Sequence, residues 1–474
     1  MRRRTLICLF LAVSFVSIAS VAFAAEVKKV ILDSDMRPGF DDGAAMVLLC
    51  GWMRMNDDNA NSSPNPSFNK IDLLGVTVEP GNEAQQRGFA HGVRQLEIIN
   101  AAQLRHSGST KVGIPIYMGA RYGLRSDRMD EDVMKAEWTI TGASRAAGYF
   151  GWVTNPAFKE NPNRDPMQPW QEFFKGTDAS DTNYGKYGVG DPVYPYAYYP
   201  KQRDGSSKAD DDGIDNAVDF IIKTVNDNPD NEVTILAIGP LTNIALALRK
   251  DPSIAGKVKE IVYMGGSFYM KGNSSAVAEF NWWADPEAAK MCVRTPWGDQ
   301  KSATFEQYGN QVIDGLEAAV YLESLPTSLD IGPATPGSNY SRAEENWFAQ
   351  SGFFYDDLVD QCRFYRTLPR NSGAYDVIAA AWLVDPNVVT TWYSASSREN
   401  PVTTNTDMVG LYVDVDSNYS TDYGRSIAYA HEGNQSGPLG TQKGAIMANT
   451  DPVKFWNEIV APAFRDPAKT TPTP

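Results

Sequence analysis

The sequence is poor in cysteine and histidine, which limits the chemistry that these side chains can supply. Of the 474 residues, 4 are cysteine and 3 are histidine. Cys8 lies in an apolar amino-terminal segment. The others, Cys50, Cys292 and Cys362, show no metal-binding spacing and allow at most one disulfide among themselves. Cys50 and Cys292 lie in apolar stretches typical of helices, so we expect buried thiols there.

An excess of positive charge is also absent. The chain has 43 Lys and Arg residues against 58 Asp and Glu residues, which gives a formal net charge of −15 at pH 7. Proteins that bind nucleic acid usually present basic patches to its phosphates. The acid excess therefore argues against a nucleic-acid partner.

Long hydrophobic runs are few, and the clearest one lies at the amino terminus. Arg2–Arg4 form a basic start, Leu6–Val21 are mostly apolar, and Ala22–Ala24 have the small residues of a cleavage site. The apolar run is short for a transmembrane span. We therefore expect residues 1–24 to be a signal peptide, and the mature protein to be periplasmic or secreted without a membrane partner.

What the chain does contain is a turn crowded with acids. Asp33 and Asp35 end an apolar, strand-like run, and Asp41 and Asp42 follow where a helix would begin. Residues two apart in a strand point to the same side, so both strand acids emerge together at its carboxyl end. Like charges this close raise one another's pKa unless a cation lies among them. A hard, oxygen-binding metal ion is the simplest candidate.

Two other interpretations of this turn are open. In the first, Asp41 only caps the helix Asp42–Cys50 and the other acids are solvated. In the second, the Asp-x-Asp pair belongs to an aspartyl-phosphate phosphatase, in which the first aspartate is a nucleophile. Ligands of open α/β sheets bind at the carboxyl ends of strands, so the location favours a binding site over solvated acids.

Strand-like and helix-like runs alternate along the chain, which is typical of an α/β protein. The strand-like runs are Val27–Leu32, Ile71–Val76, Glu232–Ala237 and Lys259–Tyr263, and the helix-like runs are Glu83–Ala102, Gly213–Asn226 and Asn243–Arg249. This order predicts a mostly parallel central sheet with helices on both faces. We expect one domain over residues 25–464, because the candidate site residues come from both ends of that range.

Three segments are predicted to be insertions on this core. Residues 56–69 have the composition of a surface loop. Residues 122–212 are rich in Trp and Tyr, which predicts a lid or a contact in a homo-oligomer. Residues 297–326 carry no chemical signal, and residues 465–474 are expected to be a flexible tail.

Several short motifs resemble the nucleoside hydrolase family in the family's own order. They are the acidic turn and the blocks Gly75–Asn82, Val233–Ala245, Met264–Gly266, Gly272–Asn273, Ala278–Asn281, Ala284–Ala289 and Tyr375–Val377. Each motif alone is weak, but together they are spread in family order over roughly 350 residues, which makes coincidence unlikely. The resemblance implies a Rossmann-like nucleoside hydrolase fold and hydrolysis of the N-glycosidic bond of ribonucleosides.

The resemblance also implies a calcium site. Asp35 and Asp42 of the first motif, Asp376 near the carboxyl end and the backbone carbonyl of Ile238 match the family's metal ligands. Such an oxygen donor set suits Ca²⁺. Asp35 is in addition the expected general base. The alternative for Asp376 is a helix N-cap.

The implied sugar-binding residues are polar side chains with several donors or acceptors. They are Asp41, Asn82, Asn273, Glu279 and Asn281. As alternatives, Asn82 and Asn273 are ordinary turn residues and Glu279 lies on a solvated face. Asp33 is expected to orient the loop or a ligand, and Asp285, which precedes a proline, is expected to be an N-cap outside the site.

Tyr375 precedes the last metal-binding aspartate, where the best-known family members have a histidine. An aromatic residue there resembles the purine-specific branch, in which stacking on the base favours its protonation as it leaves. We therefore expect a purine preference, with Trp282, Trp283 or an aromatic of the insertion as the other face. Tyr375 as plain packing is the alternative.

The sequence thus predicts an exported, Ca²⁺-dependent nucleoside hydrolase that acts on a small-molecule nucleoside, for example in purine salvage. The alternative from another class is a periplasmic nucleoside- or sugar-binding protein without turnover. Asp35 favours the enzyme, because binding alone requires no base beside the metal.

Overall fold

The structure is a computed structural model. It describes residues 26–36, 41–58, 67–82, 85, 88–89, 92, 95–96, 114–120, 123–124, 197–198, 216–321, 324, 373–403, 408–418, 420–430 and 440–464. The expected signal peptide and carboxyl-terminal tail lie outside the described residues, as do most of the aromatic insertion and of the helix expected from residue 83. No helix in the described part combines the length and the apolar character needed to span a bilayer.

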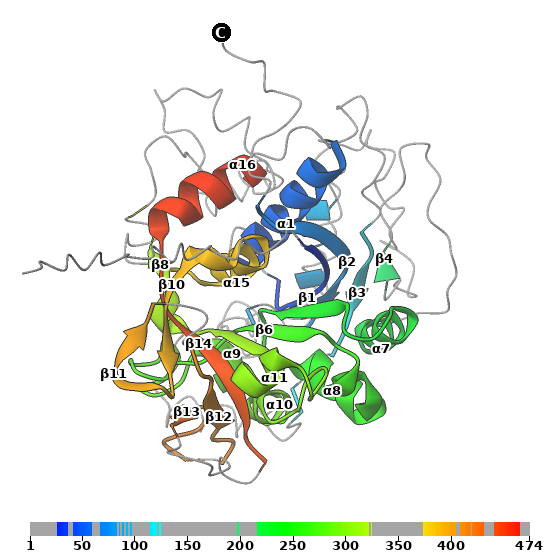
Figure 1. Ribbon diagram of the computed structural model, residues 1–474. Helices are drawn as coiled ribbons and strands as arrows, with labels where there is room; N and C mark the ends of the chain where they lie inside the picture. The colour runs from blue at the N-terminus through cyan, green and yellow to red at the C-terminus, as the bar shows by residue number, and fades with distance from the viewer. Residues whose placement is uncertain are drawn as a thin grey trace, which may run out of the picture.

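One large sheet forms the centre of the molecule (Figure 1), in the order β11-β10-β14-β7-β6-β5-β1-β2-β3-β4. From β14 to β3, all neighbouring strands are parallel. These strands are β14 Gln442–Thr450, β7 Gln311–Asp314, β6 Glu260–Met264, β5 Val233–Ala237, β1 Val27–Ser34, β2 Lys70–Val78 and β3 Ile116–Met118. The sheet is therefore mostly parallel, as the sequence predicted.

Antiparallel strands extend the sheet at its edges. Strand β4 pairs with β3, β10 pairs with β11 and β14, and β12 pairs with β13 and β14. Their bounds are β4 Ala197–Tyr198, β10 Val389–Ser394, β11 Ser397–Val402, β12 Leu411–Val415 and β13 Ser426–Tyr429. A separate short pair is β8 Val320–Tyr321 with β9 Gly373–Ala374. This antiparallel extension was not predicted from the sequence.

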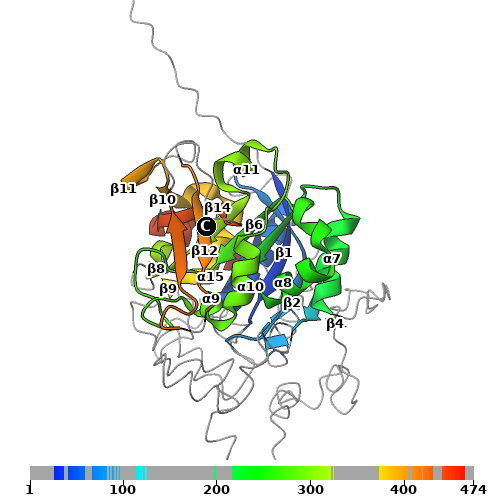
Figure 2. The same ribbon diagram turned by 90° about the horizontal axis from the view of Figure 1, so that it is seen from below.

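Helices cover both faces of the sheet. On one face lie α1 Asp41–Asp58, α15 Tyr375–Val384, the π-helix η7 Lys454–Val460 and α16 Ala461–Phe464, and on the other lie α7 Ala217–Asp227, α8 Thr242–Lys250 and α10 Pro286–Val293 (Figures 1 and 2). Val30 and Leu32 pack into the first core and Ile31 into the second. This continuous burial is typical of a parallel strand between two helical layers.

Shorter helical segments connect these elements. They are η2 Pro252–Gly256, α9 Phe280–Ala284, α11 Ala303–Tyr308, η3 Leu316–Ala318 and η6 Pro386–Val388. Cys50 of α1 and Cys292 of α10 are buried free thiols, as expected.

Local sequence explains where the helices begin and what they bury. Asn216 caps α7 by accepting a hydrogen bond from the backbone N–H of Asp219, and Phe220, Ile221 and Val225 form the buried stripe at helical spacing. On the other face, α1 approaches α16 so closely that a Cβ atom at Gly51 would clash with the backbone of α16. Glycine is therefore required at this crossing.

Two expectations about segments were wrong. Helix α1 continues to Asp58, so the surface loop does not begin at residue 56. The segment 297–326 is not an insertion, because it contains β7, a strand in the parallel part of the sheet between β6 and β14. A four-residue strand with polar residues at both ends has too little periodicity to be recognised.

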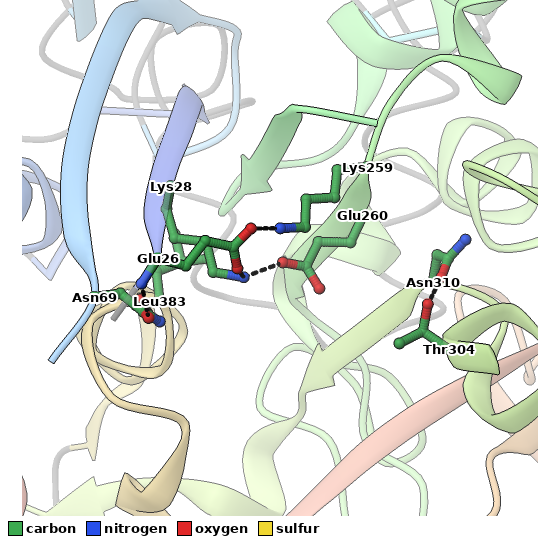
Figure 3. A network of polar contacts seen from close by, with 8 residues as sticks. All are labelled: Glu26, Lys28, Asn69, Lys259, Glu260, Thr304, Asn310 and Leu383. Carbon is green, nitrogen blue, oxygen red and sulfur yellow. Dashed lines mark hydrogen bonds and ion pairs between the residues drawn. The ribbon is translucent and has the colours of Figure 1, made fainter. Parts of the chain in front are cut away.

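A polar network closes the amino-terminal edge of the sheet (Figure 3). The buried Lys28 ammonium group lies 2.8 Å from Glu260 Oε1 and 3.3 Å from Glu26 Oε2, and Lys259 also pairs with Glu26. Nearby, the Asn69 amide donates to the Leu383 carbonyl and accepts from the Glu26 N–H. These contacts join β1 to β6 and α15 at the edge opposite the acidic turn. They are therefore structural.

Candidate active site

Asp33 and Asp35 of the acidic turn lie at the carboxyl edge of the sheet. Asp33 is opposite Thr77 of β2 and Ala237 of β5 in the parallel ladders. Asp33 and Asp35 are buried. Because parallel neighbours end at the same edge, the residues that follow β1, β2 and β5 meet at one place.

Asn82, from the segment after β2, joins two of the acids. Its backbone N–H donates to Asp35 Oδ2 over 2.5 Å, and its side-chain amide donates to Asp42 Oδ2 over 3.1 Å. The Ser34 hydroxyl donates to the other Asp42 oxygen over 2.8 Å. A Cβ atom at Gly81 would overlap the Asp35 carboxylate, so the close approach of this turn requires glycine.

The amino-terminal ends of α1 and α15 bring in the remaining acids. Asp41 Oδ2 accepts hydrogen bonds from the backbone N–H groups of Tyr375 and Asp376, at 3.1 and 3.4 Å. One oxygen from each of Asp41, Asp42 and Asp376 lies within 4.8 Å of the others. We refer to Asp35, Asp41, Asp42 and Asp376 as the acidic cluster. The chain thus gathers acids that are more than 300 positions apart in sequence.

Burial and mutual repulsion strongly perturb the acidic cluster. Burial raises the pKa of Asp42 to about 6, and burial together with the Asp42 charge raises the pKa of Asp41 to about 7. The pKa values of Asp35 and Asp376 are raised well above the usual range, first by burial and then by the neighbouring aspartates. None of the ion pairs in the described part of the chain includes these acids. Buried carboxylates this close together favour the binding of a cation among them.

The donors present fit a hard metal ion. Asp35 Oδ1 and Asp41 Oδ1 are buried without a hydrogen-bond partner, and buried polar atoms rarely remain so. Clustered carboxylate oxygens are the ligands that Ca²⁺ and similar cations prefer. Asp41, which the resemblance assigned only to the sugar, is as close to Asp42 and Asp376 as a metal ligand would be. It is therefore a candidate for both roles.

Glu279 and Asn281 form a second buried polar group beside the cluster. Glu279 caps α9 and accepts from the backbone N–H groups of Asn281, Trp282 and Gly266 at 2.8, 3.1 and 3.1 Å. Burial raises the pKa of Glu279 to about 7. The Asn281 amide donates to the Ile238 carbonyl over 3.0 Å. Because Glu279 is 1% exposed, the alternative of a solvated face is excluded.

The remaining sugar-binding candidate, Asn273, is not brought into this group. It lies on an exposed turn, and its side-chain oxygen is 3.5 Å from the Ser274 hydroxyl. Its proposed contact with a substrate stays a prediction.

Tyr375 is the first residue of α15 and lies half-buried beside the acidic cluster. Its ring packs against the backbone of Gly373, and burial raises its pKa to about 12. Trp282 does not offer a second stacking face. Its ring is fully buried and makes edge contacts with Tyr263 and Phe268.

Other acids from the sequence analysis have structural partners. Asp285 caps α10 by accepting from the Ala288 N–H over 3.1 Å, as expected. Asp376 is not an N-cap, because Ala374 occupies that position of α15. Asp33 accepts from Thr77 and from Asn243 over 2.6 and 2.8 Å, an arrangement that orients the end of β1.

Two buried acids at the same edge, Glu79 and Asp314, were not predicted from the sequence to belong to the site. Glu79 follows β2 and binds the start of α8, and Asp314 ends β7 with neither oxygen in a hydrogen bond. Burial is the main cause of the raised pKa of Asp314. The charges of Glu317, Asp41 and Glu279 raise it further. The signal that could have found both is their position directly at the carboxyl ends of strands.

Comparisons with known proteins agree with this architecture. The family model described as inosine-uridine preferring nucleoside hydrolase matches residues 30–464. Uridine nucleosidase 1 of Arabidopsis thaliana is 46% identical over 113 residues, which cover 24% of this chain and 30% of that protein. The pyrimidine-specific ribonucleoside hydrolase RihB of Escherichia coli is 28% identical over 266 residues, 56% of each chain. The chain thus aligns with about half or less of these curated relatives.

Among solved structures, a plant nucleoside hydrolase, PpNRh1, has the same fold. It superposes with a TM-score of 0.52 at 18% identity, over 92% of this chain and 99% of that one. The family model spans nearly all of the chain and begins within β1, just before the acidic turn. The protein therefore belongs to the inosine-uridine preferring nucleoside hydrolase family.

Proposed function

We propose that the protein is a Ca²⁺-dependent hydrolase that cleaves the N-glycosidic bond of ribonucleosides to free base and ribose. The observation that carries the proposal is the acidic cluster at the carboxyl edge of the sheet, whose buried members form no ion pair with any residue that the structure describes, in a chain of this family. Departure of the base leaves an oxocarbenium-like sugar. Nearby carboxylates stabilise that positive charge more than they stabilise the neutral substrate.

Asp35 is the proposed general base. Asn82 holds one of its oxygens, and the other is without a partner and free to accept a proton from water. The water oxygen then bonds to the anomeric carbon as the bond to the base nitrogen breaks. The departing base takes a proton from solvent, and Asp35 later returns to solvent the proton that it took from the attacking water. Held by Asp35, Asp42, Asp376 and the Ile238 carbonyl, Ca²⁺ would orient the water and lower its pKa.

The remaining polar residues would bind the ribose. Asp41 Oδ1 has no hydrogen-bond partner. Asn82 is nearby, because its side-chain amide donates to Asp42, the next residue. Glu279 and Asn281 are held in place by backbone groups, so they offer directed contacts with little reorganisation. Asn273 would contact the sugar from the exposed turn.

We further propose that purine nucleosides are preferred, because Tyr375 supplies an aromatic ring beside the cluster where a histidine acid is absent. Stacking on that ring would favour a purine that is protonated as it leaves. The names of the Arabidopsis and Escherichia coli relatives instead point to uridine and other pyrimidines. A preference for pyrimidines is therefore the competing outcome.

The proposed location is the periplasm or the exterior, where the enzyme would release ribose and base from scavenged nucleosides. This part rests on the basic start, apolar run and cleavage site of residues 1–24. The proposal includes no nucleic-acid or membrane partner.

A nucleoside panel with two proteins tests the proposal. The wild type should release ribose from inosine, adenosine and guanosine faster than from uridine. The Asp35→Asn variant should keep substrate binding but lose turnover by a factor of about 100 to 10,000, the range for loss of a general base. Binding of nucleosides by the wild type without any ribose release would contradict the proposal and identify a binding protein.

A further inference from the structure

Glu79 is a buried carboxylate at the site that the proposed reaction does not use. It follows β2, is 0% exposed, and its own N–H donates to the Ser34 carbonyl over 3.0 Å. Its Oε1 accepts from the Leu241 N–H over 2.7 Å, and its Oε2 accepts from the Asn243 N–H over 2.9 Å. The side chain therefore spans from β2 to the turn that joins β5 to α8.

These two hydrogen bonds cap α8 with a residue from another part of the chain. Leu241 is the N-cap of α8, and its side chain makes no capping bond. Its backbone has φ = 73°, a left-handed conformation that is unfavourable for leucine. A carboxylate at the positive end of the helix satisfies the free N–H groups and stabilises this turn.

The same turn carries the Ile238 carbonyl. The Ile238 N–H donates to the Asp33 carbonyl over 2.8 Å, which fixes the start of the turn to β1. At Gly239, a Cβ atom would lie 2.8 Å from Glu79 Oε1 and 2.9 Å from the Asp35 backbone nitrogen. The turn is thus held between β1 on one side and Glu79 on the other, with no space for a side chain at Gly239.

We propose that Glu79 is a positioning residue that holds the Ile238 carbonyl in the orientation needed to bind the metal ion. The inference rests on the proposed metal site. It assigns to Glu79 an effect on metal affinity that capping α8 alone would not have. The Glu79→Gln variant tests this, because it keeps the shape but replaces one acceptor by an NH₂ group that faces a backbone N–H donor.

The test is a calorimetric titration of the wild type and Glu79→Gln with Ca²⁺. The expected result is an affinity 10- to 100-fold weaker in the variant, as for other residues that orient metal ligands. Turnover of Glu79→Gln should recover at saturating Ca²⁺. A second variant, Gly239→Ala, disturbs the same turn from the other side and should also weaken Ca²⁺ binding.

Asp385→Asn is the matched control. Asp385 is also buried and caps a short helix, η6, but it lies at the far end of α15 and pairs with Lys454. This control should unfold at a lower temperature and bind Ca²⁺ as the wild type does. If the wild type binds Ca²⁺ and Glu79→Gln binds it with the same affinity, the inference is overturned. A wild type that binds no Ca²⁺ would overturn the proposed metal site as well.

Discussion

Replacing Asp41 by asparagine should have opposite effects on stability with and without calcium. In the metal-free protein, the Asp41 pKa rises from 3.8 to about 7, chiefly through burial and then through the Asp42 charge. That rise corresponds to about 4 kcal/mol of folding free energy lost once the carboxyl is ionised. Asparagine keeps an oxygen for the Tyr375 N–H and carries no charge.

The sign of the pH dependence follows from the raised pKa. The folded protein holds the Asp41 proton more tightly than the unfolded chain, so the free energy of unfolding falls as the pH rises from about 4 to about 7. Without calcium, Asp41→Asn should therefore be more stable than the wild type at pH 8, by up to about 4 kcal/mol. At pH 4 the two proteins should differ little.

Urea denaturation at pH 4 and pH 8, in chelator and in calcium, measures these differences. In calcium at pH 8 the order should reverse, because the bound ion compensates the wild-type charge and stabilises the folded state by mass action. A metal-free Asp41→Asn variant that is no more stable than the wild type at pH 8 would refute the repulsion inferred for the acidic cluster.

Three further predictions concern the preference for the nucleobase, the ion pair between Lys28 and Glu260, and export. Tyr375→Ala should lower turnover of purine nucleosides by about tenfold, the value of one stacked aromatic pair, whereas Tyr375→Phe should be nearly silent. If Tyr375→Phe lowered turnover strongly, the hydroxyl would have to act as an acid or hydrogen-bond donor, and the stacking proposal would be wrong. Glu260→Ala leaves the buried Lys28 ammonium group with the half-exposed Glu26 and the face of the Trp382 ring as partners, so urea denaturation should show a loss of about 3 kcal/mol with unchanged turnover of the folded protein. Unchanged stability would contradict this. Amino-terminal sequencing of the native protein should find Ala25 or Glu26 first, and an intact leader would contradict export.

The parallel core of the fold could be predicted because its signals are local. Strands β1 and β5 contain the short apolar runs Val30–Leu32 and Ile235–Ala237, and α7 and α10 begin with recognisable caps. Strand β7 was missed because it has four residues and ends in a buried aspartate. The antiparallel strands β10 to β13 were missed because they are short and mix polar with apolar residues without a clear pattern, although β10 and β11 are neighbours in sequence.

The candidate site divides in the same way. Asp35, Asp41 and Asp42 stand out because one short turn concentrates them, and family order added Asp376. The role of Glu79 could not be predicted, because its two partners lie more than 160 positions away at the start of α8. Likewise, only the structure shows that Asn273 is exposed while Glu279 is buried.

The most direct test of the central claim is ribose release from inosine by the purified protein before chelation, after chelation and after calcium is restored. If the acidic cluster holds the catalytic ion, chelation should abolish ribose release and Ca²⁺ should restore it. Full turnover in the chelated protein would contradict the metal assignment and, with it, the proposed mechanism.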